Sequence, residues 1–504
     1  MGCKDDAFPF TEELQRNLKE VFKIESLRDS QVAIVNAALN NVNVFVLMPT
    51  GGGKSLCYQL PAVTAPGITI VVSPLLSLIY DQVQALQKLG IQVVALTGKS
   101  TPADGVAAMG ALEGSGQTID GGVSSYMGIK LIYVTPERVA TERFGNALAR
   151  AYELGRLQRF VIDESHCISM WGADFRPQYG LLSMFSQRFP KTPMMALTAT
   201  ASKIVQDDIV TQLGFLQRNY VSFKSSLNRA NLHYTVCPKL GREIEGTIMT
   251  RIKEKGFADA TGIIYCFSKA DCDALAKGLN ARAGNKGKLA NGGVYAAAYH
   301  SETKNREEIQ QMWMTGAIKV ICGTIAFGMG INKPDVRFVF HHTLPKSMEG
   351  YYQESGRAGR DGERADCVIY YNDYDSDKVL SLITNTDTTN LHRNERGFAN
   401  VTDERVAAIK HDFEAVVRFC TNRSDCRRTL QLRQFDEDFD SKLCQGTCDN
   451  CRRRAKQAVA ATAAAAATAS DNNTNAAVEQ NRKRDSGSQQ RIETFFKKAK
   501  TVKE

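Results

Sequence analysis

One short stretch of the sequence combines the residue types that bind phosphate groups. Residues 47–62 read LMPTGGGKSLCYQLPA and follow an apolar run, residues 42–47, that predicts a buried strand. Consecutive glycines would let the backbone curl until its N–H groups point at an anion; they are Gly51, Gly52 and Gly53. Lys54, where we expect a helix to open, would reach the outer phosphates of a nucleoside triphosphate, and Ser55 would bind Mg²⁺. Met48 replaces a glycine of the full pattern, so the alternative is a plain glycine-rich turn.

A pair of carboxylates follows another apolar run. Residues 160–166 read FVIDESH, which predicts a strand that ends in two acidic side chains. Asp163 would hold Mg²⁺ through water, and Glu164 would position or activate the attacking water molecule. An apolar strand followed by acidic residues is common. The motif indicates a metal site because the phosphate-binding stretch belongs to the same predicted sheet.

Aromatic side chains and an arginine come directly after these carboxylates. Residues 167–180 read CISMWGADFRPQYG, a loop punctuated by glycine and proline. Such a mixture is typical of loops that stack on nucleic-acid bases, and its position beside the carboxylates also favours a coupling role. The alternative is that the aromatic rings fold into the core. The candidates are Trp171, Phe175, Arg176 and Tyr179.

A second group of candidate phosphate ligands stands near residue 355. Residues 351–362 read YYQESGRAGRDG and present Gln353, Arg357 and Arg360. We expect these three residues at the start of a helix, on nearly one face. Arginines that one domain offers to a nucleotide held by another form an arginine-finger arrangement. The alternative is a solvated basic patch.

The elements that would position these groups alternate between apolar strands and helical stretches. This alternation predicts an α/β fold of two doubly wound parallel sheets, with ligands at the carboxyl ends of the strands. Residues 100–128, rich in Gly, Ser and Thr, are expected to form a long exposed loop. The predicted strands are residues 68–74, 93–96, 129–136, 160–163 and 194–200, then 262–268, 294–301, 318–324 and 337–343. Hydroxyls at the end of 194–200 could link the two halves.

Four cysteines towards the C-terminus have the spacing of metal ligands. Cys426 precedes a predicted helix, and the run CQGTCDNC supplies Cys444, Cys448 and Cys451. Four thiolates can close a tetrahedral Zn²⁺ site, and the remaining cysteines are scattered as in proteins of a reducing compartment. The alternatives are surface thiols, or Cys420 in place of Cys426.

The composition is that of an ordinary globular protein with a basic tail. The chain has 504 residues and a formal net charge of +9, of which residues 452–504 contribute +7. A body so nearly neutral would bind nucleic acid through local grooves rather than a global field. No apolar run approaches the ~18 residues of a membrane span, and the first residues lack the layout of a secretory signal.

These motifs together resemble the RecQ family of superfamily 2 DNA helicases. TGGGKS, DESH, the FRP-containing loop, TAT, GMGINKPDVR and QESGRAGRDG stand in the family's order, within residues 15–455. The resemblance implies two RecA-like lobes, ATP and Mg²⁺ as cofactors, and 3′→5′ unwinding of DNA. It also implies that Thr50 belongs to the nucleotide-binding loop and that Cys426, before Arg-Arg, is the first zinc ligand.

The adenine-reading glutamine of that family corresponds to Gln31, with Arg28 and Phe22 beside it. A glutamine amide offers a donor and an acceptor to the edge of adenine, although a surface position is the alternative. Leu27 and Lys23 depart from the family's usual Phe and Gly.

The tail carries a short motif of a different kind. Residues 489–496 read QQRIETFF, in which Gln489, Ile492, Phe495 and Phe496 match a peptide that resembles ligands of the sliding clamp PCNA. One helical turn would place the three apolar side chains on one side as a plug; a coincidental amphipathic segment is the alternative. Basic runs on either side of the motif are compatible with import into the nucleus.

The sequence therefore predicts four segments. Residues 1–223 form an N-terminal segment and first lobe, 224–375 a second lobe, 376–455 a helical zinc-binding subdomain, and 456–504 a disordered basic tail too short for a winged-helix domain. We expect an ATP-dependent DNA helicase of DNA replication, recombination or repair. The alternatives are a clamp-tethered DNA-binding or strand-annealing ATPase with little unwinding activity, and an RNA helicase.

Overall fold

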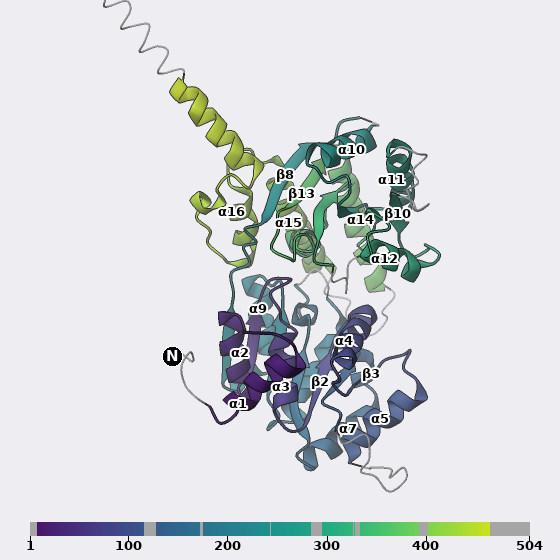
Figure 1. Cartoon of the computed structure of the whole chain (residues 1–504), viewed down its shortest axis with the longest axis vertical. Helices are drawn as coiled ribbons and strands as arrows, with labels where there is room; N and C mark the ends of the chain where they lie inside the picture. The colour runs from purple at the N-terminus through teal and green to yellow at the C-terminus, as the bar shows by residue number, and fades with distance from the viewer. Residues whose placement is uncertain are drawn as a thin grey trace, which may run out of the picture.

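Two parallel β-sheets form the frame of the molecule (Figure 1). The computed structural model describes residues 8–114, 128–171, 175–241, 243–283, 295–325, 327, 333–392 and 402–463, with backbone alone at 385–392 and 402–405. Within these ranges, no helix combines the length and the apolar character needed to cross a membrane. The PCNA-like motif at residues 489–496 lies outside them.

The first sheet has seven strands in the order β3-β4-β2-β5-β6-β1-β7, and all of its pairings are parallel. Its inner strands are buried on both faces, as is usual when helices cover a parallel sheet. Along β1, for example, Val44 and Val46 join one apolar cluster, and Phe45 and Leu47 join the other. The strands are β1 Asn43–Leu47, β2 Ile68–Val72, β3 Val93–Leu96, β4 Leu131–Val134, β5 Leu157–Ile162, β6 Met194–Thr198 and β7 Tyr220–Lys224.

Helices surround this sheet and complete the first lobe, residues 8–224, drawn in purple to blue in the lower half of Figure 1. Most run between consecutive strands, as the predicted alternation requires. They are α1 Thr11–Arg16, η1 Asn17–Val21, α2 Asp29–Leu39, α3 Leu56–Thr64, α4 Leu76–Lys88, α5 Pro102–Glu113, α6 Pro136–Val139, α7 Glu142–Glu153, η3 Ser165–Ile168, η4 Pro177–Ser183, α8 Met184–Arg188, α9 Lys203–Gln212 and η5 Phe215–Gln217.

Helix α5 corrects the prediction of a long loop at residues 100–128. Thr101 caps it by accepting a hydrogen bond from the backbone N–H of Asp104 at 3.2 Å, and Pro102 occupies its first position. Leu112 and several small residues of the helix are buried in the core. The glycine and alanine content that suggested a loop instead provides a thin helix face that packs closely.

The second sheet has six parallel strands in the order β10-β11-β9-β12-β13-β8. The strands predicted for this sheet are confirmed, although each is shorter than predicted. Strands β8 and β13 of this sheet, and β7 of the first sheet, were not predicted. The second lobe, residues 232–371, contains β8 Leu232–Pro238, α10 Ile244–Glu254, β9 Thr261–Tyr265, α11 Lys269–Arg282, β10 Ala296–Tyr299, α12 Arg306–Met314, β11 Val320–Gly323, β12 Val336–His341, α13 Met348–Ser355 and β13 Ala365–Tyr371.

A helical zinc module, residues 373–463, packs beside the outer strand β8 (Figure 1). It contains α14 Asp373–His392, α15 Thr402–Thr421, α16 Arg427–Leu432, η7 Arg433–Phe435 and η8 Ser441–Cys444. Apolar contacts join it to both lobes: Tyr352 of α13 and Phe435 of the module meet edge to face at 5.1 Å, within the core cluster of the first lobe. Residues of the two lobes and of the module therefore pack together in one apolar cluster.

Candidate nucleotide and zinc sites

The phosphate loop, residues 48–55, leaves β1 at the carboxyl edge of the first sheet. Gly51 and Gly53 have φ values of +78° and +85°, which glycine adopts without strain. A Cβ atom on Gly53 would lie 2.4 Å from Nε2 of Gln31, so any other residue here would displace the amide of Gln31. Helix α3 begins at Leu56, two residues after the predicted start, and Ser55 stands before it.

Lys54 lies under this loop and faces the predicted metal-binding carboxylates. Its Nζ donates a hydrogen bond to the carbonyl of Met48 at 3.1 Å. Burial lowers the pKa of Lys54, and the charges of Glu164 and Asp163 raise it in part. The ammonium group therefore lies between the loop and the two carboxylates, as a lysine that binds phosphate next to Mg²⁺ must.

The carboxylates come from the tight turn after β5. Glu164 has a φ of +48°, a left-handed conformation that costs a non-glycine residue on the order of 1 kcal/mol or more. Its backbone N–H donates to Oδ1 of Asp163 at 3.1 Å. Burial, followed by the charge of Glu164, raises the pKa of Asp163 to about 7. A divalent cation beside Asp163 would lower this pKa again, because it favours the ionised carboxylate. Carboxylate oxygens are ligands that Mg²⁺ prefers, so the residues present fit this ion.

Strand β6 lies between β1 and β5, and its end connects the carboxylates to the second lobe. The Nδ1 atom of His166 lies 3.4 Å from Oε2 of Glu164 and 2.8 Å from Oγ1 of Thr198. Thr198 Oγ1 donates to the carbonyl of Thr200 at 2.9 Å, and Nε2 of Gln353 donates to Thr200 Oγ1 at 3.0 Å. The hydroxyls at this strand end thus link the two halves, as predicted, and the role of His166 was missed.

The predicted adenine-reading residues also lie near the phosphate loop. Gln31 is buried rather than on the surface; its Nε2 donates to the carbonyl of Gly53 at 3.2 Å, and its Oε1 accepts from the backbone N–H of Arg28 at 2.9 Å. Arg28 Nη1 donates to the carbonyl of Gly51 at 3.1 Å, and Phe22 is buried nearby in the core. These contacts place the glutamine beside the phosphate loop.

The predicted arginines belong to a loop and not to a helix face. Helix α13 ends at Ser355, so Gln353 occupies its last turn, and Arg357 and Arg360 follow in the arginine loop, residues 356–362. The expected helical face is therefore wrong. Glycines punctuate this loop, two of them with φ values of +54° and +89°, and they bend the backbone towards the first lobe; they are Gly356, Gly359 and Gly362.

This loop nevertheless brings the side chain of Arg360 to the phosphate loop. A Cβ atom on Gly51 would lie 3.6 Å from Cγ of Arg360. Burial, followed by the charges of Arg357 and Arg229, lowers the pKa of Arg360 to about 10. Cationic groups that crowd together at a partly buried place favour an anion between them. Sequence reasoning missed Arg229, which stands in the interlobe linker, residues 225–231, and belongs to none of the motifs.

The aromatic loop divides into exposed and buried side chains. Trp171 is 42% exposed, whereas Tyr179 is completely buried and donates its hydroxyl to the carbonyl of Asp163 at 3.1 Å. Tyr179 therefore cannot stack on a base, and for this side chain the alternative, that the ring folds into the core, is confirmed. Arg176 Nη1 donates to the carbonyl of Pro74 at 2.8 Å, and Phe175 is half-buried.

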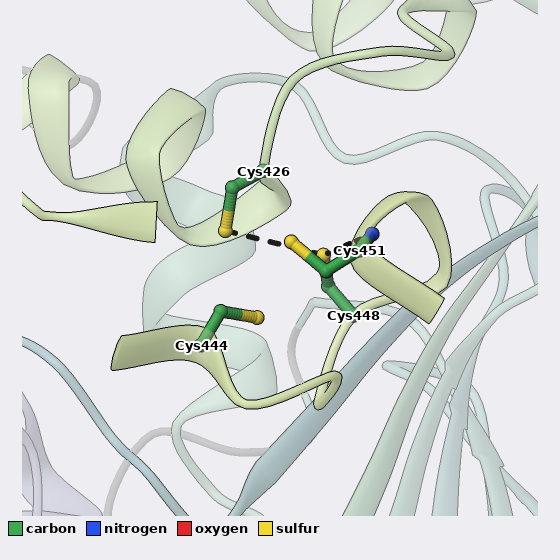
Figure 2. A group of neighbouring side chains, drawn as sticks. All are labelled: Cys426, Cys444, Cys448 and Cys451. Carbon is green, nitrogen blue, oxygen red and sulfur yellow. Dashed lines mark hydrogen bonds between the residues drawn. The ribbon is translucent and has the colours of Figure 1, made fainter. Parts of the chain in front are cut away.

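Four thiol groups converge in the zinc module (Figure 2). The sulfur atoms of Cys426, Cys444, Cys448 and Cys451 all lie within 4.8 Å of one another. Cys426 is the residue before α16, and Cys444 ends η8. Cys448 stands just before the next helical segment, and Cys451 lies in its first turn. Hydrogen bonds from Cys426 and Cys448 lower the pKa of Cys444 far below that of an ordinary thiol. Four sulfurs in this arrangement fit tetrahedral Zn²⁺, and Cys420 is not among them.

The cysteine cluster is attached to the edge of the second sheet. The backbone N–H of Tyr234 in β8 donates to the carbonyl of Thr447 at 3.1 Å, and that of Val236 donates to Oδ2 of Asp449 at 3.1 Å. Arg427, buried beneath the cluster, pairs with Asp449 at 2.8 Å. The module thereby satisfies backbone groups that an edge strand would otherwise expose.

Comparisons with known proteins identify the class and then the family. Family models match residues 28–208 (DEAD/DEAH box helicase), 249–362 (helicase conserved C-terminal domain) and 375–452 (RecQ zinc-binding). Two parallel-sheet lobes with these matches and this phosphate loop define a superfamily 2 helicase core. The zinc module and its four cysteines narrow the class further: the chain belongs to the RecQ family.

Comparisons with individual relatives agree. The chain is 44% identical over 451 residues to the ATP-dependent DNA helicase Q-like 4B of Arabidopsis thaliana, covering 88% of this chain and 37% of that protein. It is 42% identical over 453 residues to the RecQ-like DNA helicase BLM of Xenopus laevis, covering 88% and 31%. It thus spans roughly a third of these relatives. The solved structure of Mycobacterium smegmatis helicase Lhr bound to ssDNA and AMP-PNP has the same fold, with a TM-score of 0.54 at 17% identity over 83% of this chain and 58% of that one.

Proposed function

We propose that this chain is an ATP-dependent DNA helicase that moves 3′→5′ along one strand. The observation that carries the proposal is the approach of Arg360, from the second lobe, to Gly51 of the phosphate loop in the first. A nucleotide bound there would contact both lobes, so its hydrolysis would change how the lobes pack. The names of the matched relatives describe ATP-dependent or RecQ-like DNA helicases, which supports DNA as the substrate.

The residues present fit the roles that hydrolysis needs. Lys54 would bind the outer phosphates, Ser55 and Asp163 would hold Mg²⁺, and Glu164 would orient the attacking water. Arg357 and Arg360 would offset the charge that develops on the γ-phosphate.

Three further sets of residues would serve the nucleotide, lobe closure and the DNA. Gln31, with Arg28 and Phe22, would bind the adenine. The hydrogen bond between Gln353 and Thr200 would transmit lobe closure. The exposed Trp171, with Phe175 and Arg176, would contact the displaced or tracked strand.

Strand displacement on a panel of duplexes tests this proposal. We expect unwinding of a duplex with a 3′ single-stranded tail, little with a 5′ tail, and none when ATP or Mg²⁺ is omitted. RNA in place of the tracked DNA strand should stimulate ATP hydrolysis less. Annealing of complementary strands without ATP-driven unwinding would instead identify the chain as a strand-annealing ATPase.

We propose that the four segments predicted from the sequence are also functional divisions. Residues 1–223 would bind the nucleotide, 224–375 would supply the arginines, 376–455 would hold zinc, and 456–504 would tether partners. The basic runs of the tail support action in the nucleus, in DNA replication, recombination or repair.

We further propose that residues 489–496 bind the sliding clamp PCNA. Replacing Phe495 and Phe496 by alanine removes two of the three apolar side chains of the plug, so capture on immobilised PCNA should fall at least about tenfold. Lys497→Ala with Lys498→Ala, next to the motif, is the matched control and should bind as wild type does. Equal capture of wild type and the Phe495/Phe496 double variant would contradict the assignment.

A further inference from the structure

The side chain of Arg229 joins two loops that belong to different lobes. Its Nη1 donates a hydrogen bond to the carbonyl of Thr50 in the phosphate loop at 3.0 Å. The same guanidinium also donates to three carbonyls of the arginine loop: Gly356 at 3.3 Å, Ala358 at 3.1 Å and Gly359 at 2.7 Å. One planar group therefore fixes the distance between the two loops.

Arg229 also stands beside the residues proposed to meet the nucleotide. A Cβ atom on Gly51 would lie 3.7 Å from Nη1 of Arg229 and 3.6 Å from Cγ of Arg360, so both arginines reach the same glycine of the phosphate loop. The charge of Arg229 contributes to the lowered pKa of Arg360. Repulsion between these guanidinium groups would relax when a triphosphate occupies the loop.

The backbone at Arg229 is itself held in place by the zinc module. Buried Arg428 donates to the carbonyl of Arg229 at 2.7 Å, to that of Ala230 at 3.0 Å and to that of Leu232 at 2.5 Å. The carboxylate of Glu437, also from the module, accepts from the backbone N–H of Leu227 at 2.7 Å. The guanidinium of Arg229 thus projects from a fixed segment, which suits a residue that sets the position of others.

We propose that Arg229 is a positioning residue for ATP hydrolysis. It holds the arginine loop against the phosphate loop, so that Arg357 and Arg360 meet the outer phosphate when the lobes close. This inference rests on the proposed ATPase function. Because the hydrogen bonds of Arg229 within the described residues all go to main-chain carbonyls, its removal leaves the side chains that bind ATP in the first lobe intact. Removing Arg229 therefore lowers the rate of ATP hydrolysis and leaves the affinity for ATP unchanged.

The test is Arg229→Gln in the full chain, with ATP hydrolysis measured in saturating single-stranded DNA. Charge-assisted hydrogen bonds of this kind correspond to a fall in kcat of about 10- to 100-fold. We expect the KM for ATP and the affinity for a fluorescent ATP analogue to stay within about threefold. Arg229→Lys keeps the charge without the planar fork and should recover part of the rate.

Arg218→Gln is the matched control. Arg218 donates to the carbonyls of Pro190 and Thr192, but all of these residues belong to the first lobe. We expect its kcat to stay within about twofold of wild type, because the same kind of bracing is lost without a change between the lobes.

Three outcomes would overturn the assignment of Arg229. Wild-type kcat in Arg229→Gln overturns the inference, and so does an equal loss of kcat in Arg218→Gln, because general destabilisation then explains both. An unchanged kcat with a raised KM also overturns it, because it would show that Arg229 binds ATP. If the wild-type chain hydrolyses no ATP with DNA, the proposed function itself fails.

Discussion

Lys54→Ala should abolish DNA-stimulated ATP hydrolysis. Lys54 lies between the phosphate loop and the carboxylates of Asp163 and Glu164. Loss of one preorganised charge-stabilising group from such a site costs about 100- to 1000-fold in turnover. Phosphate release measured with and without single-stranded DNA gives the result directly.

DNA binding provides the complementary measurement. Lys54 is recessed under the phosphate loop, so the variant should bind a tailed duplex within about threefold of wild type. Lys88→Ala, at the exposed end of α4, is the control for removing a positive charge from the first lobe and should leave both measurements unchanged. Turnover by Lys54→Ala close to that of wild type would remove the basis for the nucleotide site.

Cys448→Ser should remove zinc and unfold the zinc module. Cys448 is completely buried at the centre of the cysteine cluster, with its sulfur 4.0 Å from that of Cys426. Binding of structural zinc by four thiolates contributes about 10 kcal/mol or more, so loss of a ligand should destabilise the module by at least about 4 kcal/mol. Metal analysis should show zinc content falling from about one ion per chain to near zero, and the first thermal transition should drop by on the order of 15 °C.

Cys420→Ala is the matched control for this experiment. Cys420 is also buried in the module, but its sulfur lies outside the cluster of four. Its replacement removes one sulfur from the core, at a cost of about 1–2 kcal/mol, and should leave the zinc content unchanged. Zinc retained by Cys448→Ser, or lost from Cys420→Ala, would show that the ligand set is wrong.

The consequences of zinc loss should extend beyond the module. Thr447 and Asp449 occupy the backbone donors of β8, and Arg428 holds the linker that carries Arg229. A module that no longer packs on this edge would release all of these contacts together. We therefore expect Cys448→Ser to lower ATP turnover as well, with a smaller effect than Lys54→Ala.

Local motifs could be recognised from the sequence because their geometry depends on neighbouring residues. Three glycines followed by Lys54 and Ser55 specify a turn that presents backbone N–H groups, whatever the rest of the chain does. Closely spaced cysteines such as Cys444 and Cys448 can meet around one ion without help from distant segments. Runs of continuous apolar residues likewise predict strands that are buried on both faces, as in a parallel sheet.

The predictions were wrong where the local sequence is compatible with more than one kind of structure. The alanine and glycine content of residues 102–113 fits a loop or a thin packed helix, and packing against helix α7 and strand β3 favours the helix. In the arginine loop, Gly356 ends α13 where a helical pattern suggested continuation. The sequence around Tyr179 is typical of a base-stacking loop, but the side chain is buried in the core.

By itself, the sequence determined most strands of the two sheets, the phosphate loop, the carboxylate pair and the zinc ligands. The tertiary structure alone decided which residues of the second lobe reach the first, that Gln353 meets Thr200, and that Arg229 joins the phosphate loop to the arginine loop. The physical reason is the separation along the chain. These contacts join segments more than 100 residues apart, and they form only when apolar burial has docked the lobes and the zinc module together.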